Sequence, residues 1–171
     1  MGRPSLLTVR VALICATFLM ISAAKAAAGP TVTISQSIPF AESSGASDKV
    51  KAECTLDTRL PKFIQDSAKA HGFTVDLGSG TAGRVLQIEF TNIIGAGGGA
   101  WSGAKSVTVN GKLTEDGKVI GTFIASRYSG GGMFAGYKGT CSILGRCIKT
   151  LGKDIAAWLA NPTMDARLGN V

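Results

Sequence analysis

The glycine-rich stretch ahead of a predicted strand is the strongest candidate for phosphate chemistry. Gly99 to Ser106 comes within one residue of the nucleotide-binding P-loop pattern, with Ala104 in place of the glycine that precedes the lysine. A P-loop works because its lysine opens a helix whose N–H groups and dipole meet the phosphates. Here Lys105 opens a segment with the period-two pattern of a strand. We therefore expect no nucleotide site, and the dinucleotide-binding glycine pattern fails for the same reason.

Three aromatic residues in glycine-rich segments are the candidate binding residues. Trp101 lies in the first segment, and Phe134 and Tyr137 lie in a second one after Tyr128. A large aromatic side chain among glycines has few neighbours, so it either folds back as a plug or contacts a partner. If the topology places both segments at the same end of the sheet, the three side chains form one contact surface.

No set of residues has the spacing of a catalytic or metal site. His71 is the sole histidine, and its place at a predicted helix end suits the negative end of the helix dipole. Asp154 is expected on a solvent face or paired with Arg146 or Lys153. Glu89 is expected on the exposed face of a strand. Metal-ligand spacing, a nucleophile elbow and a Cys-x-x-Cys motif are all missing from the sequence. We therefore expect a non-enzymatic domain without cofactor or metal.

The N-terminal residues 1–26 are expected to be a cleaved secretory signal. Two arginines accompany an almost wholly apolar run over 11–21, and an Ala-x-Ala site allows cleavage after Ala26, with Ala28 as an alternative. The run is too short to span a bilayer, and no stop-transfer pattern follows it. An uncleaved anchor is the less favoured alternative.

Cleavage would lower the formal charge from +7 to +4, because the leader contains three cations and no acid. We expect residues 27–162 to form one α/β domain and 163–171 to be a flexible tail. The modest positive charge could favour an anionic envelope surface. Nucleic acid is excluded as a partner, because no arginine stripe with interleaved aromatic residues occurs in the sequence.

The mature chain keeps three cysteines, and export would expose them to an oxidising compartment. Loop closure favours a disulfide between Cys141 and Cys147. Within one regular helix, however, these residues would lie about 9 Å apart, beyond disulfide reach. A local bridge therefore requires the last helix to start near Gly145 or Arg146. The alternative links Cys54 to one of the other two and staples two helices together. The sequence favours these two pairings almost equally, with a slight preference for the local bridge between Cys141 and Cys147.

Hydrophobic periodicity predicts the elements that must position these residues. The predicted strands cover residues 31–36, 73–77, 84–90, 105–113 and 119–126, and a hairpin turn at 115–118 helps join the last three into an antiparallel meander.

Two amphipathic helices are expected beside these strands. The first lies between Ser47 and Ala70, and Gly72 closes it. A start capped by Asp57 or Thr58 would put Pro61 in the first turn. An earlier start capped by Ser47 would need a kink at Pro61. The second runs from Ser142 or Arg146 to Ala160. Because both helices must bury an apolar stripe, the sequence predicts an α+β two-layer sandwich. Its mixed sheet has about five strands, in the order strand, helix, four strands, helix, with both helices on one face.

The C-terminal run around Cys141, Arg146-Cys147, Leu151–Ile155 and Trp158 is the most specific part of a resemblance that covers roughly 31–162. The chain resembles uncharacterised bacterial exported proteins and lipoproteins with a small α/β domain. Their relatives in shape include periplasmic accessory domains of envelope-assembly and peptidoglycan-synthase-activating lipoproteins. The resemblance carries over no catalytic residues.

The chain departs from the lipoprotein members of this group at Cys15. This cysteine lies within the apolar run and follows the bulky Ile14, where lipid attachment needs a small residue. The departure puts outer-membrane anchoring in doubt.

These observations predict a periplasmic or secreted, non-enzymatic domain for protein–protein interaction in the envelope. It would bind an envelope protein or cell-wall component through its glycine-rich segments or a sheet edge. It would keep no stable membrane span after signal cleavage. The alternative is a small-ligand or polysaccharide-binding protein that uses Trp101, Phe134 and Tyr137 as stacking groups.

Overall fold

The structure, a computed structural model, describes residues 30–95, 104–129 and 139–171. The expected signal segment 1–26 therefore lies outside the described residues. The elements follow in the order β1 (Thr31–Ile34), α1 (Asp48–Cys54), α2 (Leu56–Ala68), β2 (Thr74–Leu77), β3 (Arg84–Ile94), β4 (Lys105–Glu115), β5 (Lys118–Ser129), α3 (Thr140–Ala160) and β6 (Ala166–Gly169).

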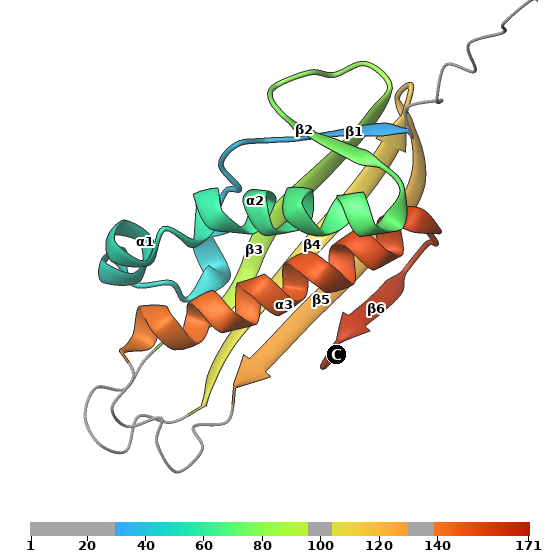
Figure 1. The fold of residues 1–171 in the computed structure, drawn as a ribbon. Helices are drawn as coiled ribbons and strands as arrows, with labels where there is room; N and C mark the ends of the chain where they lie inside the picture. Colours follow the sequence, from blue (N-terminus) through green and yellow to red (C-terminus); the bar gives the residue numbers. More distant parts are fainter. Residues whose placement is uncertain (1–29, 96–103, 130–138) are drawn as a thin grey trace, which may run out of the picture.

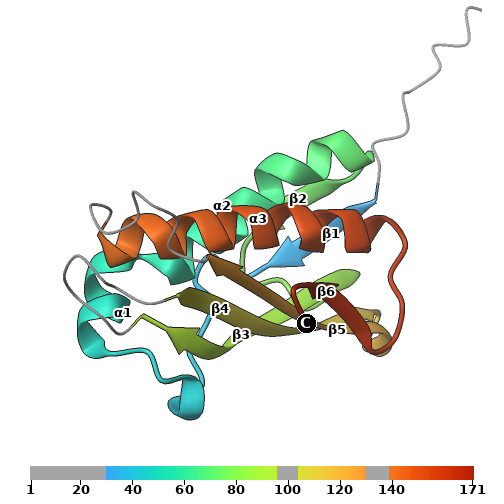
Figure 2. The ribbon, with the colours of Figure 1, turned by 90° about the horizontal axis from the view of Figure 1, so that it is seen from below.

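The strands form one mixed sheet in the order β2-β1-β3-β4-β5-β6. β1 runs parallel to both β2 and β3, while β3, β4 and β5 form the antiparallel meander. The predicted turn is confirmed, because Asp116 and Gly117 have φ angles of 49° and 82°. The α2 and α3 helices cover one face of the sheet, so the predicted α+β sandwich is confirmed (Figures 1 and 2). The sheet has six strands where about five were expected.

The extra strand is β6, which corrects the prediction of a flexible tail over 163–171. β6 adds to the sheet parallel to β5. The chain before it is held by hydrogen bonds from Thr122 Oγ1 to an Asp165 carboxylate oxygen and from Asp165 N to Thr122 Oγ1, and after it Asn170 N donates to Ser126 O. These contacts join residues more than 40 positions apart, so the local sequence pattern of a four-residue strand did not reveal them.

The first predicted helix is two helices. Ser47 caps α1 by accepting a hydrogen bond from Val50 N at 3.3 Å. The chain then breaks at Thr55, whose φ of 47° lies in the left-handed region. The predicted cap at Ser47 is therefore the N-cap of α1. The α2 helix follows Thr55, so the predicted start at Asp57 or Thr58 was wrong.

Pro61 consequently lies inside α2 rather than in its first turn. A proline there has no N–H to give to the carbonyl four residues earlier. That carbonyl, Asp57 O, accepts instead from Ile38 N at 3.2 Å. The segment after β1 thus satisfies a helix carbonyl that proline leaves without a donor.

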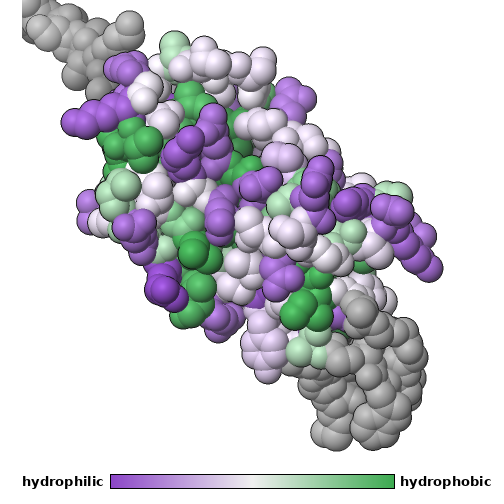
Figure 3. Space-filling view, turned by 180° about the vertical axis from the view of Figure 1, so that it is seen from behind, coloured by the Kyte–Doolittle hydropathy of each residue, from purple (hydrophilic) through white to green (hydrophobic). Residues whose placement is uncertain are grey.

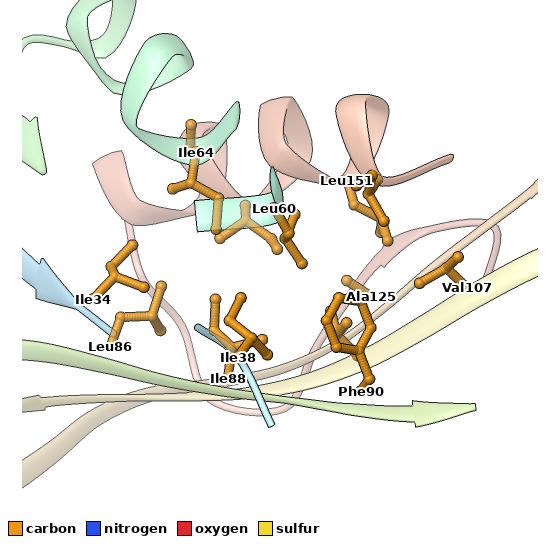
Figure 4. Packing of buried hydrophobic residues seen from close by; sticks show 14 of the residues in the cluster. Ile34, Ile38, Leu60, Ile64, Leu86, Ile88, Phe90, Val107, Ala125 and Leu151 are labelled. Carbon is orange, nitrogen blue, oxygen red and sulfur yellow. The ribbon is translucent and has the colours of Figure 1, made fainter. Parts of the chain in front are cut away.

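The core lies between the helices and the sheet. Leu86, Ile88 and Phe90 of β3 point toward the helices, as their alternation predicted, and each is at most 7% exposed. Figure 4 shows Leu60, Ile64 and Leu151 extending toward this surface from α2 and α3. The remaining buried side chains that the figure labels are Ile34, Ile38, Val107 and Ala125.

The two helices approach closely at Gly152 of α3. A Cβ atom there would lie 2.7 Å from the Cβ atom and 2.9 Å from the carbonyl carbon of Phe63 in α2. Backbone atoms cannot rotate away as the end of a side chain can, so only glycine permits this helix spacing.

We predict that Gly152→Ala destabilises the protein by roughly 1–3 kcal/mol, the usual cost of overpacking, even though alanine has the higher helix propensity. Urea denaturation monitored by circular dichroism measures the change. Thr150→Ala introduces the same residue on the exposed side of the same helix and should leave stability almost unchanged. An unchanged or raised midpoint for Gly152→Ala would contradict this account of the helix contact.

Candidate functional site

The aromatic candidates Trp101, Phe134 and Tyr137 belong to segments 96–103 and 130–138, outside the described residues. Their roles stay predictions. The described residues that flank these segments show where the two segments attach to the fold.

Both segments attach at one end of the sheet. At the end of β3, Ile94 pairs with Ser106 of β4, and Lys105 pairs with Ser129 at the end of β5. Figure 1 shows these ends beside the start of α3. We call this region, bounded by Ile94, Lys105, Ser129 and Gly139, the loop end of the sheet. The predicted contact surface required the topology to place both segments at one end of the sheet. Their attachment points meet this condition.

A row of three residues at the loop end points away from the helices. Ile94 and Tyr128 both lie in register with Ser106, so the three side chains share a face across β3, β4 and β5. The neighbours of Ser106, Lys105 and Val107, are fully buried on the helix side. Ile94 is 49% exposed and Tyr128 58% exposed. We call Ile94, Ser106 and Tyr128 the exposed row.

The exposed row was missed because the predicted strands 84–90 and 119–126 end before Ile94 and Tyr128. A bulge in β3 also changes the direction in which Ile94 points. Strict alternation from the buried Phe90 would turn Ile94 toward the helices. The register shifts between Phe90 and Asn92, so Ile93 is buried and Ile94 faces outward. The bulge contains no glycine or proline that would signal an irregularity. Its residue Thr91 is β-branched and fits a regular strand equally well.

The rest of this open sheet face is mainly polar. The next row contains Asn92, Thr108 and Ser126, and the hydroxyl groups of Thr108 and Ser126 lie 3.1 Å apart. Farther on, Glu89 is exposed as predicted, and Ile124 is 40% exposed. Figure 3 shows the face as hydrophobic patches among hydrophilic residues, and in Figure 1 the α2 and α3 helices lie on the opposite side of the sheet. The exposed row is thus an apolar edge next to a hydrophilic surface.

On the helix side, the loop end is closed by a disulfide between Cys54 and Cys141, whose Cα atoms are 4.8 Å apart. The slight preference for a bridge between Cys141 and Cys147 was wrong, because α3 begins at Thr140 and contains both residues in one helix. The alternative, a staple from Cys54, is confirmed. It joins the end of α1 to the first turn of α3.

Cys147 is the remaining thiol of the described residues, and it is buried. Desolvation by burial raises the pKa of its thiol, which disfavours the reactive thiolate. Its sulfur lies 4.0 Å from the Lys105 carbonyl oxygen. The arrangement suits a packed core residue and not a nucleophile.

Asp154 forms a two-point ion pair with Arg127 of β5, and not the expected contact with Arg146 or Lys153. The Nε and Nη2 atoms of Arg127 donate to the two carboxylate oxygens at 2.7 and 2.8 Å. This hydrogen bonding raises the pKa of Arg127. The pair joins α3 to the sheet, so both groups are engaged in holding the fold.

One cleft of about 470 Å³ lies over β4, β5 and β6, and its lining includes Asp165 and Arg167. Asp165 in this cleft already accepts a hydrogen bond from Thr122 Oγ1. A cleft of about 250 Å³ adjoins the disulfide and is smaller than usual ligand pockets. A cleft of about 400 Å³ lies where β1 leaves β3, and no titratable side chain lines it.

His71 is exposed at the turn after α2. Within residues 30–95, 104–129 and 139–171, no group of three or more His, Cys, Asp or Glu residues could hold a metal. Over the same ranges, no helix has the length and apolarity to cross a membrane.

No protein-family model and no curated protein matches this sequence. Solved structures do resemble it. Protein XCC0632 from Xanthomonas campestris, of the DUF330 family, is 7% identical with a TM-score of 0.48, covering 77% of this chain and 84% of that one. The PelC dodecamer from Paraburkholderia phytofirmans is 17% identical with a TM-score of 0.47, covering 74% and 89%. A minor lipoprotein from Acinetobacter baumannii is 14% identical with a TM-score of 0.45, covering 77% and 90%.

These names agree with the resemblance to uncharacterised, lipoprotein-like small α/β domains. At such identities and TM-scores the likeness concerns the arrangement of elements, and it assigns no residue a function.

We predict that removing the disulfide by Cys54→Ala with Cys141→Ala destabilises the protein by about 3–4 kcal/mol, because the bridge closes a loop across a sequence separation of 87 residues. Denaturant unfolding of the oxidised protein and of the double variant measures the loss. Reductant should destabilise the unaltered protein and leave the double variant unaffected. Equal stability of the two proteins in the absence of reductant would show that the staple does not stabilise the fold.

We predict a separate loss of stability at alkaline pH that depends on Cys147. Its pKa is raised in the folded protein, so above the ordinary thiol pKa of about 8.5 the unfolded state loses a proton first. Stability should therefore fall as pH rises through this window, by at most about 1.4 kcal/mol per pH unit. Unfolding free energies of the unaltered protein and of Cys147→Ala, measured from pH 7 to 10, test this. Parallel curves would exclude a contribution from this thiol.

Proposed function

We propose that the chain is an exported, envelope-associated and non-enzymatic module that binds a protein partner through the loop end of its open sheet face. The observation that carries the proposal is the exposed row, in which Ile94 and Tyr128 remain open to solvent on either side of Ser106. We extend the site to Trp101, Phe134 and Tyr137, because the segments that contain them attach at the same end of the sheet.

The exposed row suits a protein partner for two physical reasons. Tyrosine is enriched among the residues that dominate binding energy, since it offers a large apolar surface with a polar tip. In addition, the row lies on paired strands of an antiparallel meander, so little conformational entropy is lost when it is covered. The row is small compared with the roughly 800 Å² that each partner buries in a typical interface. The neighbouring aromatic segments would supply further area.

Export is supported by the disulfide as well as by residues 1–26. A bridge between Cys54 and Cys141 persists in an oxidising compartment and is unusual in a reducing cytosol. A non-enzymatic role is supported by the state of the polar groups that might act in catalysis. Arg127 and Asp154 are engaged with each other, and Cys147 is buried.

We predict that Ile94→Ser with Tyr128→Ser weakens partner binding at least tenfold while the protein stays folded. The change removes two exposed apolar contacts of the sort that form interface hot spots. A photo-crosslinking residue placed at Ser129 would capture the partner from an envelope extract, and titration of the purified partner would give the affinities of the variants.

The matched control is Val119→Ser with Met164→Ser, which removes two apolar side chains that are 39% and 55% exposed at other places on the surface. This control should bind normally. Equal weakening by both double variants, or full binding by the exposed-row variant, would refute the proposed surface. Retention on cell-wall polysaccharide without any protein crosslink would favour the small-ligand or polysaccharide class instead.

A further inference from the structure

The outward surface of the α2 and α3 helices has a strong bias in charge. The α2 and α3 helices lie side by side on one side of the sheet (Figures 1 and 2). The exposed charged residues of α2, of the turn that follows it and of α3 are Lys62, Asp66, Lys69, Arg146, Lys149 and Lys153. We call these six residues the basic helical face.

The spacing of these residues places them away from the core. Arg146, Lys149 and Lys153 recur every three or four positions, so they form one stripe along α3. Leu144, Ile148 and the other buried residues of α3 occupy the opposite side. Lys62 and Lys69 are seven positions apart and share a side of α2 and its extension.

Charge is distributed unevenly between this face and the rest of the described residues. The face contains five cations and one carboxylate, a formal charge of +4, whereas the other described side chains contain nine cations and ten carboxylates, a formal charge of −1. The sequence gives no run of basic residues, because the five cations are spread over two helices and more than 90 positions. Folding is what gathers them.

The positive stripe on α3 works against helix stability. Arg146 with Lys149, and Lys149 with Lys153, are like-charge neighbours at positions where opposite charges would stabilise a helix. The two ion pairs of the described residues join Arg84 to Glu115 and Arg127 to Asp154, so neither involves the basic helical face. Asp154, the acid within α3, instead turns toward the sheet.

We propose that the basic helical face docks reversibly on an anionic lipid surface. Two helices side by side present an extended array of charges, which matches a charged plane better than a small ligand. Four of the five cations are lysines, which act as mobile point charges rather than as the fixed forks that arginine offers to single anionic groups. Juxtaposed lysines and arginines attract protein to anionic bilayers through the surface potential.

Nucleic acid fits this face less well. Single strands are bound by aromatic side chains on which bases stack, alongside the basic groups. The aromatic residue of α2 at this surface, Phe63, is half-buried between the helices, with the Arg59 guanidinium 5.6 Å above its ring. Arg59 therefore already contacts this ring, which reduces its availability for stacking with a base. Docking by the helices would leave the opposite, open sheet face directed away from the lipid, so the inference does not depend on the proposed function.

The test is cosedimentation of the purified protein with vesicles of zwitterionic lipid alone and with vesicles containing about one third anionic lipid. We expect binding to anionic vesicles that falls to the zwitterionic level in about 0.5 M salt, where screening is strong. The zwitterionic vesicles also report any insertion of the apolar 11–21 segment, which does not require anionic lipid. Equal partitioning to both kinds of vesicle would overturn the proposal.

The triple variant Arg146→Gln, Lys149→Gln and Lys153→Gln should lower partitioning to anionic vesicles about a hundredfold, at roughly fivefold for each charge near the surface. The matched control is Lys112→Gln, Lys118→Gln and Arg167→Gln, which changes net charge equally at exposed positions of the sheet. It should lower partitioning less than fivefold. Thermal unfolding establishes that both variants are folded.

Equal loss in the two triple variants would overturn the proposal, since net charge and not this face would then govern binding. Unaltered partitioning of the helix variant would overturn it as well. Binding to a soluble polyanion without binding to anionic vesicles would assign the face to a different class of partner and would also overturn it.

Discussion

The packing of α2 and α3 on a single face of the sheet is the constraint on which the rest of the structure depends. Leu60, Ile64 and Leu151 bury the inner face of the meander, and the helix spacing is set where Gly152 meets the backbone of Phe63. A strand alternates its side chains between two faces, so covering one face leaves every second residue of the meander to solvent. The open sheet face and the basic helical face are both consequences of this one-sided arrangement.

Two long-range contacts hold α3 in its place. The Cys54–Cys141 disulfide ties its first turn to α1, and the Arg127–Asp154 ion pair ties its later half to β5. Because both contacts involve α3, the helix and the strands that end beside it form one framework. The loop end therefore has well-defined attachment points, on which a binding surface can be built with little loss of entropy.

The sequence predicted those features that depend on local pattern. Alternation of Leu86, Ile88 and Phe90 located β3, and Asp116-Gly117 located the hairpin turn between β4 and β5. Features that depend on distant residues escaped it. The disulfide pairing required knowing where α3 begins, and β6 is held by hydrogen bonds to a strand about 40 residues earlier in the chain.

The candidate site shows the same division between local and distant information. The sequence singled out the glycine-rich segments, and the topology brings their attachment points together. It missed Ile94, because the predicted strand ended at Phe90, and no residue signals the bulge that turns Ile94 outward. The helical spacing of Arg146, Lys149 and Lys153 can be read in the sequence, but only the tertiary fold adds Lys62 and Lys69 from a second helix to the same layer.

We propose that a partner binds at the loop end of the open sheet face, and not on the face that the helices cover. Carbene footprinting of the protein in intact cells and after purification tests this directly. We expect labelling of Ile94 and Tyr128 to be lower in cells than in the purified protein, while labelling of Val119 is the same in both. Equal labelling of all three residues in the two samples would contradict the claim.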